Sequence, residues 1–252
     1  MKTREMMALV GVELKKLYRD PMSLAVMLAM PVMLTLVFYF ALGNMPTWWL
    51  EGASHFEFLV PGTMGIAVIY MIMMVAMGLC TYREAGLLKR LETTPASATT
   101  YLGSQVIANM VIGAAQGLVV LLLSVLLGFR PQGGLPGLVL TTICLALLAA
   151  SSVGFGLLTA TVAKSSGAAS GLSMIFIIPM MIFGTWLTAF NEMTFAIARF
   201  TPNFYVTEPL TRIFHGAPMS DGIVWKDMLI LLIISLVAAF AGIQLFKKTE
   251  YR

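Results

Sequence analysis

Long apolar runs alternate with short polar segments along the whole chain. Six of these runs reach the roughly 20 residues that an α-helix needs to cross about 30 Å of hydrocarbon. They cover residues 22–42, 58–80, 101–128, 137–162, 168–190 and 227–246. The segments between them are short, so residues 1–252 are expected to form a single membrane domain. The pattern predicts an all-α integral membrane protein with six transmembrane helices.

An amphipathic helical pattern precedes the first run. Met6, Val10, Leu14 and Leu17 recur at steps of four, four and three residues, and Glu5, Glu13, Lys15, Lys16 and Arg19 lie elsewhere on the helical wheel. This spacing is typical of an interfacial helix that lies flat on a membrane surface. We therefore expect an amino-terminal interfacial helix over residues 3–19.

A second amphipathic segment separates the second apolar run from the third. Its leucines fall on one side of a helix and its charges on the other. The apolar side contains Leu87, Leu88 and Leu91, and the charged side contains Arg83, Glu84, Lys89, Arg90 and Glu92. Pro95 is expected to end this helix, because proline disfavours helix in the residue before it. The segment is either a surface helix that a partner can contact or a solvated connector.

Composition supports a membrane protein and gives its orientation. Hydrophobic residues make up 59% of the chain and charged residues 11%, against about a quarter charged in a typical soluble domain. Of the 16 Lys and Arg residues, only Arg130, Arg199, Arg212 and Lys226 fall on one side of the six-span arrangement. Positive loops are retained in the cytoplasm. We therefore expect a protein of the cell membrane whose two termini both lie in the cytoplasm. The net charge of +4 reflects this topology, and we expect no nucleic acid partner.

A few residues inside the runs are candidates for more than packing. Asn109 and Gln116 lie seven residues apart and share one helical face. Because buried amides need a partner, they either bond a neighbouring helix or line a polar pathway. Met73 and Met77 are either core filler or part of an adaptable binding surface. Pro31 leaves one carbonyl of the first span without its helical donor, which favours a kink.

Residues 191–226 form the longest segment on the outer side, and it is too apolar to be fully solvated. Aromatic residues alternate there with charges and are interrupted by prolines. This pattern predicts short helices that dip into the outer leaflet. Glu208 and Arg212 are spaced to form an ion pair on one such helix.

The sequence lacks the motifs of several kinds of chemistry. The chain contains no Gly-x-x-x-x-Gly-Lys phosphate loop, and neither His55 nor His215 has a partner at metal-ligand spacing. Cys80 and Cys144 lie within predicted spans and indicate no redox compartment. No charged residue falls well inside a run as drawn, which disfavours an ion-coupled transporter. We therefore expect no enzyme activity, metal or cofactor in this chain, and an energy source that docks on its cytoplasmic face.

Four stretches in order along the chain carry a resemblance to a known family. They are Leu17-Tyr-Arg-Asp-Pro-Met-Ser, Phe58-Leu-Val-Pro-Gly-Thr-Met, Arg83-Glu-Ala-Gly-Leu-Leu-Lys-Arg-Leu-Glu-Thr-Thr-Pro95, and the outer segment from Pro179 through Pro202 to Arg212. Together they resemble the type 2 family of ABC transporter permeases, the ABC-2 exporters, nearest to its drug-resistance and Nod-factor-like members.

The resemblance implies an export permease without ATPase activity of its own. Two ABC ATPase subunits, which hold ATP and Mg, would dock below two permease copies among membrane lipids, and a homodimer is favoured over a heterodimer. The substrate would be an amphipathic, drug-like or lipid-like molecule. The alternatives are a polysaccharide or glycolipid exporter, and an assembly or anchoring subunit that recruits a cytoplasmic partner.

The resemblance also implies roles for particular residues. The segment 83–95 would be the coupling helix that contacts the ATPase, through Arg83, Glu84, Gly86, Leu87, Lys89, Arg90, Leu91 and Pro95. The segment 191–226 would be a reentrant outer gate that includes Phe200, Pro202, Glu208 and Arg212.

Overall fold

The computed structural model describes residues 2–42, 55–87, 97–186, 192–218 and 220–250, and every regular element in these ranges is helical. The elements are α1 (Lys2–Arg19), α2 (Pro21–Leu42), α3 (His55–Ile69), α4 (Met71–Glu84), α6 (Ala98–Leu126), α7 (Gly134–Val162), α8 (Ser166–Met181), the π-helical turn η1 (Ile182–Trp186), α9 (Glu192–Ala198), α10 (Phe204–Phe214) and α11 (Gly222–Glu250).

Six helical stretches in the described residues are long and apolar enough to cross a membrane. They are Leu24–Ala41, Phe56–Glu84, Ala98–Leu126, Gly134–Val162, Ser166–Gly184 and Gly222–Thr249. The second stretch combines α3 and α4, which are joined at Tyr70. The prediction of an all-α protein with six membrane spans is confirmed, and the chain is a multi-pass membrane protein.

The span ends differ from the predicted limits by a few residues, and two of the differences bring charged residues into a span. The second span continues past residue 80 to Glu84, and the last span begins at Gly222 instead of residue 227. As a result Arg83 and Glu84 belong to the end of α4, and Asp227 lies in the second turn of α11. Apolar runs underestimate these helices because charged residues at helix ends find partners within the protein.

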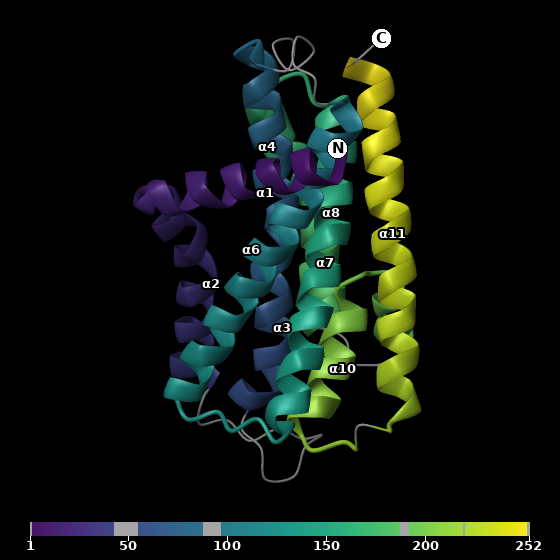
Figure 1. The fold of residues 1–252 in the computed structure, drawn as a ribbon. Coiled ribbons are helices and arrows are strands. Elements are labelled where there is room, and N and C mark those ends of the chain that lie inside the picture. Colours follow the sequence, from purple (N-terminus) through teal and green to yellow (C-terminus); the bar gives the residue numbers. More distant parts are fainter. Residues whose placement is uncertain (1, 43–54, 88–96, 187–191, 219, 251–252) are drawn as a thin grey trace.

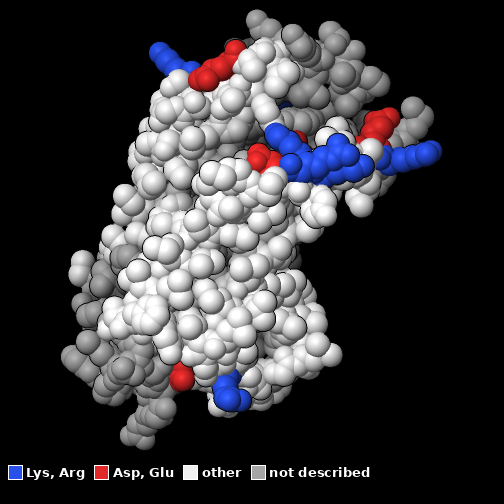
Figure 2. Space-filling view, turned by 90° about the vertical axis from the view of Figure 1, so that its left-hand side faces the viewer, with Lys and Arg blue, Asp and Glu red and all other residues white. Residues whose placement is uncertain are grey.

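Five of the six spans form an upright bundle from which α2 stands slightly apart, and α1 crosses it almost at right angles (Figure 1). We call the end of the bundle that carries α1 and the last turns of α11 the terminal end. The opposite end, which carries the connection from α6 to α7, is the far end. On the face drawn in Figure 2, charged side chains gather along α1 and at both extremes, and the surface between α1 and the far end is uncharged. This distribution matches a membrane-spanning belt.

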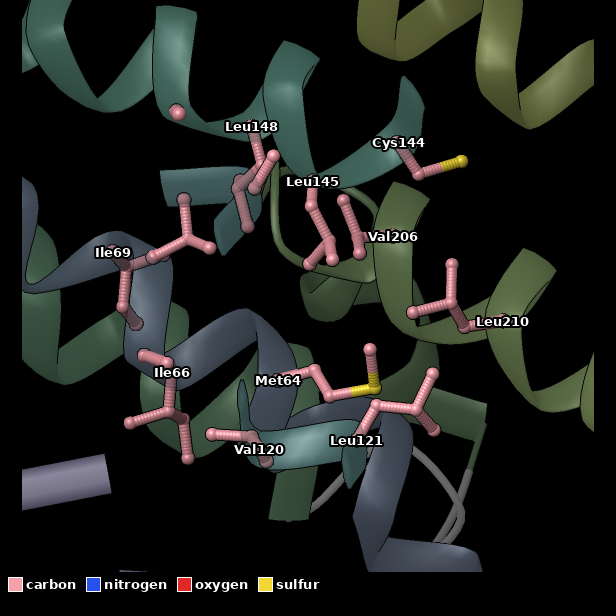
Figure 3. Close-up of a cluster of buried hydrophobic side chains, with 14 of the residues drawn as sticks. Met64, Ile66, Ile69, Val120, Leu121, Cys144, Leu145, Leu148, Val206 and Leu210 are labelled. Carbon is pink, nitrogen blue, oxygen red and sulfur yellow. The ribbon is translucent and has the colours of Figure 1, made fainter. Parts of the chain in front are cut away.

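The main hydrophobic core joins α3, α6 and α7 to the short helix α10. Met64, Ile66 and Ile69 of α3 are fully buried against side chains of α6 and α7 (Figure 3). Val206 and Leu210 of α10 point into the same cluster and are also fully buried. The helix α10 is therefore packed into the bundle and does not merely lie along its surface.

Small residues allow α7 and α11 to approach closely. A Cβ atom added to Gly154 of α7 would collide with the backbone of Ala238 and Ala239 in α11. A Cβ atom at Gly242 of α11 would lie 2.6 Å from the carbonyl oxygen of Gly154. Membrane helices associate largely through such close backbone packing.

Replacing Gly154 by valine is expected to destabilise the protein by about 3 kcal/mol, because the added side chain meets backbone that cannot move aside. The measurement is thermal unfolding in detergent. The matched control is Gly171→Val in α8, where an added Cβ would contact nothing within 4 Å. Equal melting temperatures for the two variants would contradict the close approach of α7 and α11.

Candidate functional site

The end of α4 is hydrogen-bonded to the end of α7. Arg83 donates from Nη1 to the carbonyl oxygen of Ala163 and from Nη2 to that of Ala160, both at 2.7 Å. The last carbonyls of a helix have no helical donor, and they form the negative end of the helix dipole. The guanidinium of Arg83 supplies two donors to these carbonyls and places a positive charge at the negative end of the dipole.

The next residue is bonded to the beginning of the following helix. A carboxylate oxygen of Glu84 accepts a hydrogen bond of 2.9 Å from the backbone N–H of Ser166, the first residue of α8. Exposed N–H groups and the positive end of the dipole favour an anion at this position. Two adjacent residues of opposite charge therefore attach α4 to both sides of the α7–α8 turn. We call Arg83 and Glu84 with their partners Ala160, Ala163 and Ser166 the terminal clamp.

The chain changes direction directly after the terminal clamp. Ala85 is the C-cap of α4, and Gly86 adopts a φ of +67°, which glycine tolerates because it lacks a Cβ atom. The backbone returns to a helical conformation at Leu87, whose side chain is 40% exposed. The surface helix expected from Arg83 onward is thus interrupted at Gly86.

The remaining residues predicted to contact an ATPase are Lys89, Arg90, Leu91 and Pro95, and they lie outside the described residues. Of the predicted contact set, Arg83 and Glu84 face partners within the chain, and Leu87 faces outward.

Two polar contacts attach α1 to the bundle at the same end. Lys16 donates a hydrogen bond to the hydroxyl of Tyr82 in α4, and its ammonium lies 4.7 Å from the centre of that ring. Gln105 of α6 donates to Glu13 at 2.8 Å. Burial alone would lower the pKa of Lys16, but the hydrogen bond to Tyr82 and the nearby carboxylates raise it above its ordinary value. Lys16 therefore stays positively charged at neutral pH.

Gln116 compensates for the proline in the first span. Pro31 has no N–H for the carbonyl of Met27, four residues earlier. The side-chain amide of Gln116, which is 3% exposed, donates to that carbonyl at 3.5 Å. Of the two open interpretations of Gln116, this contact favours the bond to a neighbouring helix.

Asn109 has a different environment from Gln116. It donates a hydrogen bond of 2.8 Å to the carbonyl of Gln105 in its own helix. It also lines a cavity of about 340 Å³ between α1, α2, α4 and α6. Met73 accepts a hydrogen bond from Ser170 of α8, and Met77 packs against the smaller hydrophobic cluster near the terminal end. These methionines join α4 to its neighbours.

The outer segment contains the predicted ion pair and a further partner. Arg212 contacts Glu208 at 2.8 Å, which confirms the predicted pair, and also contacts Asp221 at 3.3 Å. Burial alone would lower the pKa of Arg212, but the hydrogen bonds and charges of the two carboxylates raise it. Asp221 also accepts a hydrogen bond from the N–H of Ile223 in the first turn of α11. The ion pair therefore connects α10 to the beginning of the last span.

The two other predicted gate residues are placed differently. Phe200 is 89% exposed, whereas Pro202 is buried between α9 and α10.

Two buried polar residues near the outer segment, Asn203 and Asp227, were not identified from the sequence. Asn203 is fully buried, donates to the carbonyl of Met180 at 3.4 Å, and fills the space beside Gly65 and Gly184. Asp227 is 5% exposed and lies within electrostatic range of Arg212. An amide among aromatic residues and an acid at the edge of the last apolar run were the available signals.

Within the described residues, no group of three or more His, Cys, Asp and Glu side chains is placed to hold a metal ion.

The fold and the terminal clamp define a class of protein: a six-span membrane protein in which the second span is hydrogen-bonded to the ends of the next two helices at the α7–α8 turn. The sequence matches the ABC-2 type transporter family over residues 4–215. The chain belongs to this family. Its members are membrane subunits of ABC transporters, generally not catalytic, and they associate with an ABC ATPase. No curated protein matches the sequence.

Gln116→Glu is expected to destabilise the protein by about 2–4 kcal/mol at pH 7, because a buried carboxylate would face the carbonyl of Met27. Gln116→Leu removes the donor without adding a charge, so its effect is expected to stay within about 1 kcal/mol. Thermal unfolding in detergent compares the two variants. Equal stability would show that Gln116 does not face that carbonyl.

Proposed function

We propose that the chain is the permease subunit of an ATP-driven exporter in the cell membrane, with its terminal end in the cytoplasm. Two copies, identical in the favoured arrangement, would assemble with two ATPase subunits that hold ATP and Mg. The substrate is an amphipathic drug-like or lipid-like molecule, moved outward. The family assignment supports the ATPase partner, and the terminal clamp is the observation that carries the mechanism.

The terminal clamp gives the segment after Gly86 a mechanical connection to the spans. Arg83 holds the last carbonyls of α7 and Glu84 holds the first N–H of α8. Motion of an ATPase against the segment from Leu87 to Pro95 would therefore be applied to three spans together. In this proposal Leu87, Lys89, Arg90, Leu91 and Pro95 contact the ATPase, and Arg83 and Glu84 transmit its motion.

The helix α8 supplies a continuous path to the proposed outer gate. Its first residue, Ser166, is bonded to Glu84, and near its other end the carbonyl of Met180 accepts the hydrogen bond of Asn203. Asn203 immediately precedes α10, which carries Glu208 and Arg212. A displacement of α8 would change the packing of α10 and open or close the gate of residues 191–226.

Reconstitution tests the proposed function directly. The chain is purified from native membranes with its associated proteins and placed in liposomes with ATP. We expect one ATPase copy per permease copy and ATP-dependent movement of a lipophilic dye across the bilayer. Co-purification of an ATPase without flux of any amphipathic probe would favour the anchoring subunit, and the absence of an ATPase would overturn the mechanism.

Arg83→Gln is expected to reduce ATP-driven transport at least about tenfold while the ATPase stays bound, because two charge-assisted hydrogen bonds to α7 are lost. Arg83→Lys keeps the charge but not the paired donors, so it is expected to be intermediate. Both are measured as transport per ATP hydrolysed.

The matched control for Arg83→Gln is Lys164→Gln, which removes an exposed positive charge from the same α7–α8 turn. It is expected to leave the ratio of transport to hydrolysis unchanged. If the two variants give the same ratio, Arg83 does not transmit the motion.

A further inference from the structure

A hollow of about 480 Å³ lies on the exposed side of α1, near the end of that helix. Its lining consists of Val12, Lys15, Lys16, Arg19 and Asp20. Three cations against one carboxylate give the lining a net charge of +2. Over the whole segment 2–20, five Lys and Arg residues likewise exceed three carboxylates. We call this site the basic hollow, and its charge favours an anionic occupant.

Lys15 and Arg19 carry the charge that is available to such an occupant. Lys16 is already bonded to Tyr82 of α4. Lys15 and Arg19 are exposed, and neither has a hydrogen-bonded or ion-paired partner within the part of the chain that the structure describes. They are four residues apart, so both can reach one anion. A guanidinium binds a phosphate through two parallel hydrogen bonds, and an ammonium adds a point charge.

The basic hollow lies at the level of a membrane surface. Arg19 precedes the apolar stretch Leu24–Ala41 by only five residues. At the terminal end, α4 and α11 extend beyond α1 (Figure 1). Lys and Arg side chains gather along α1, and the surface from there toward the far end is uncharged (Figure 2). The position of α1 at this border is the position of phospholipid headgroups.

Exposed apolar side chains accompany the cations on α1. Met7 is 59% exposed and Tyr18 is 83% exposed. They are eleven residues apart, which is about three helical turns, so they lie on the same side of the helix. A helix at a membrane surface inserts such side chains among the lipids and keeps its Lys and Arg residues near anionic headgroups. This composition favours a lipid over a soluble acidic protein as the partner of α1.

The first span provides a surface for an acyl chain. Met22, Val26, Met30 and Met33 of α2 recur at steps of four, four and three residues, and each is at least 43% exposed. Met22 follows Asp20 of the basic hollow by two residues. An apolar strip therefore begins beside the basic hollow and continues into the membrane. A ligand that matches both surfaces has a phosphate at one end and a hydrocarbon chain at the other.

We propose that the basic hollow and this strip bind an anionic phospholipid from the leaflet nearest the terminal end. The phosphate bonds Lys15 and Arg19, and an acyl chain lies along Met22, Val26 and Met30. The bound lipid contacts both α1 and α2 and thereby stabilises the angle between them. This binding is a property of the chain alone and does not depend on the proposed function.

Photolabelling of the purified permease in phosphatidylcholine nanodiscs tests the site. Two probes carry the same photoreactive acyl chain, one on anionic phosphatidylglycerol and one on zwitterionic phosphatidylcholine, and mass spectrometry identifies the labelled peptides. General contact with lipid labels a peptide equally with both probes. We expect the anionic probe to label α2 peptides about tenfold more strongly, because cations near the surface attract anionic lipid. Peptides of α11 that contain the exposed Leu236 and Val237 are expected to be labelled equally.

Two variants with matched changes of charge locate the preference. Lys15→Gln combined with Arg19→Gln removes the proposed phosphate contacts, so the tenfold preference of α2 is expected to disappear. The control is Lys247→Gln combined with Lys248→Gln, which removes two exposed positive charges from the last turns of α11 at the same end of the molecule. The control is expected to keep the preference. Lys15→Arg combined with Arg19→Lys preserves both charges and is expected to keep most of it.

Each outcome decides the proposal. Equal labelling of α2 by the two probes, or the same loss in the control, would overturn the phospholipid site. Displacement of the anionic probe by inorganic phosphate would assign the basic hollow to a soluble anion and would also overturn it. A preference that only the Lys15 and Arg19 replacement abolishes would establish the site, whether or not the reconstituted complex transports. The proposed function and the lipid site can therefore fail separately.

Discussion

The hydrogen bonds from Arg83 to the carbonyls of Ala160 and Ala163, at the end of α7, are the contact on which the terminal end depends. A guanidinium at this position supplies donors to a helix end that has none and places positive charge at its negative pole. Glu84 does the opposite at the beginning of α8. Because the two residues are adjacent, one turn of α4 fixes the positions of two other helices. Through these contacts α4, α7 and α8 are joined at this turn.

Polar side chains also bond helix ends in the outer part of the molecule. Asn203 holds the carbonyl of Met180 near the end of α8, and Arg212 joins α10 to Asp221 at the beginning of α11. The first contact joins residues 23 positions apart in the sequence, and the second joins residues nine positions apart. Between the two ends, the spans pack through apolar side chains and small residues, as between Gly154 and Ala238. Polar contacts at the ends therefore set the geometry, and apolar packing keeps the spans together.

The position of α1 gives the cavity its character. A helix that crosses the spans brings a row of charged residues next to their apolar side chains. Met27, Met71 and Met74 alone would form an ordinary gap between helices, open to hydrocarbon. With Glu13, Lys16 and Asp20 beside them, the cavity has a charged end and an apolar end. The attachment of α1 through Glu13 and Lys16 keeps this arrangement in place.

The sequence by itself determined the six spans, the amino-terminal helix and the pairing of Glu208 with Arg212. These features follow from local chemistry: the length of apolar runs, helical periodicity and spacing by one helical turn. The tertiary structure alone decided that Arg83 and Glu84 bond α7 and α8, that Gln116 compensates for Pro31, and that Asn203 and Asp227 are buried. Each depends on which helices become neighbours, and periodicity within one helix carries no information about the partner across from it. The cavity has the same origin, because its lining comes from four helices that only folding brings together.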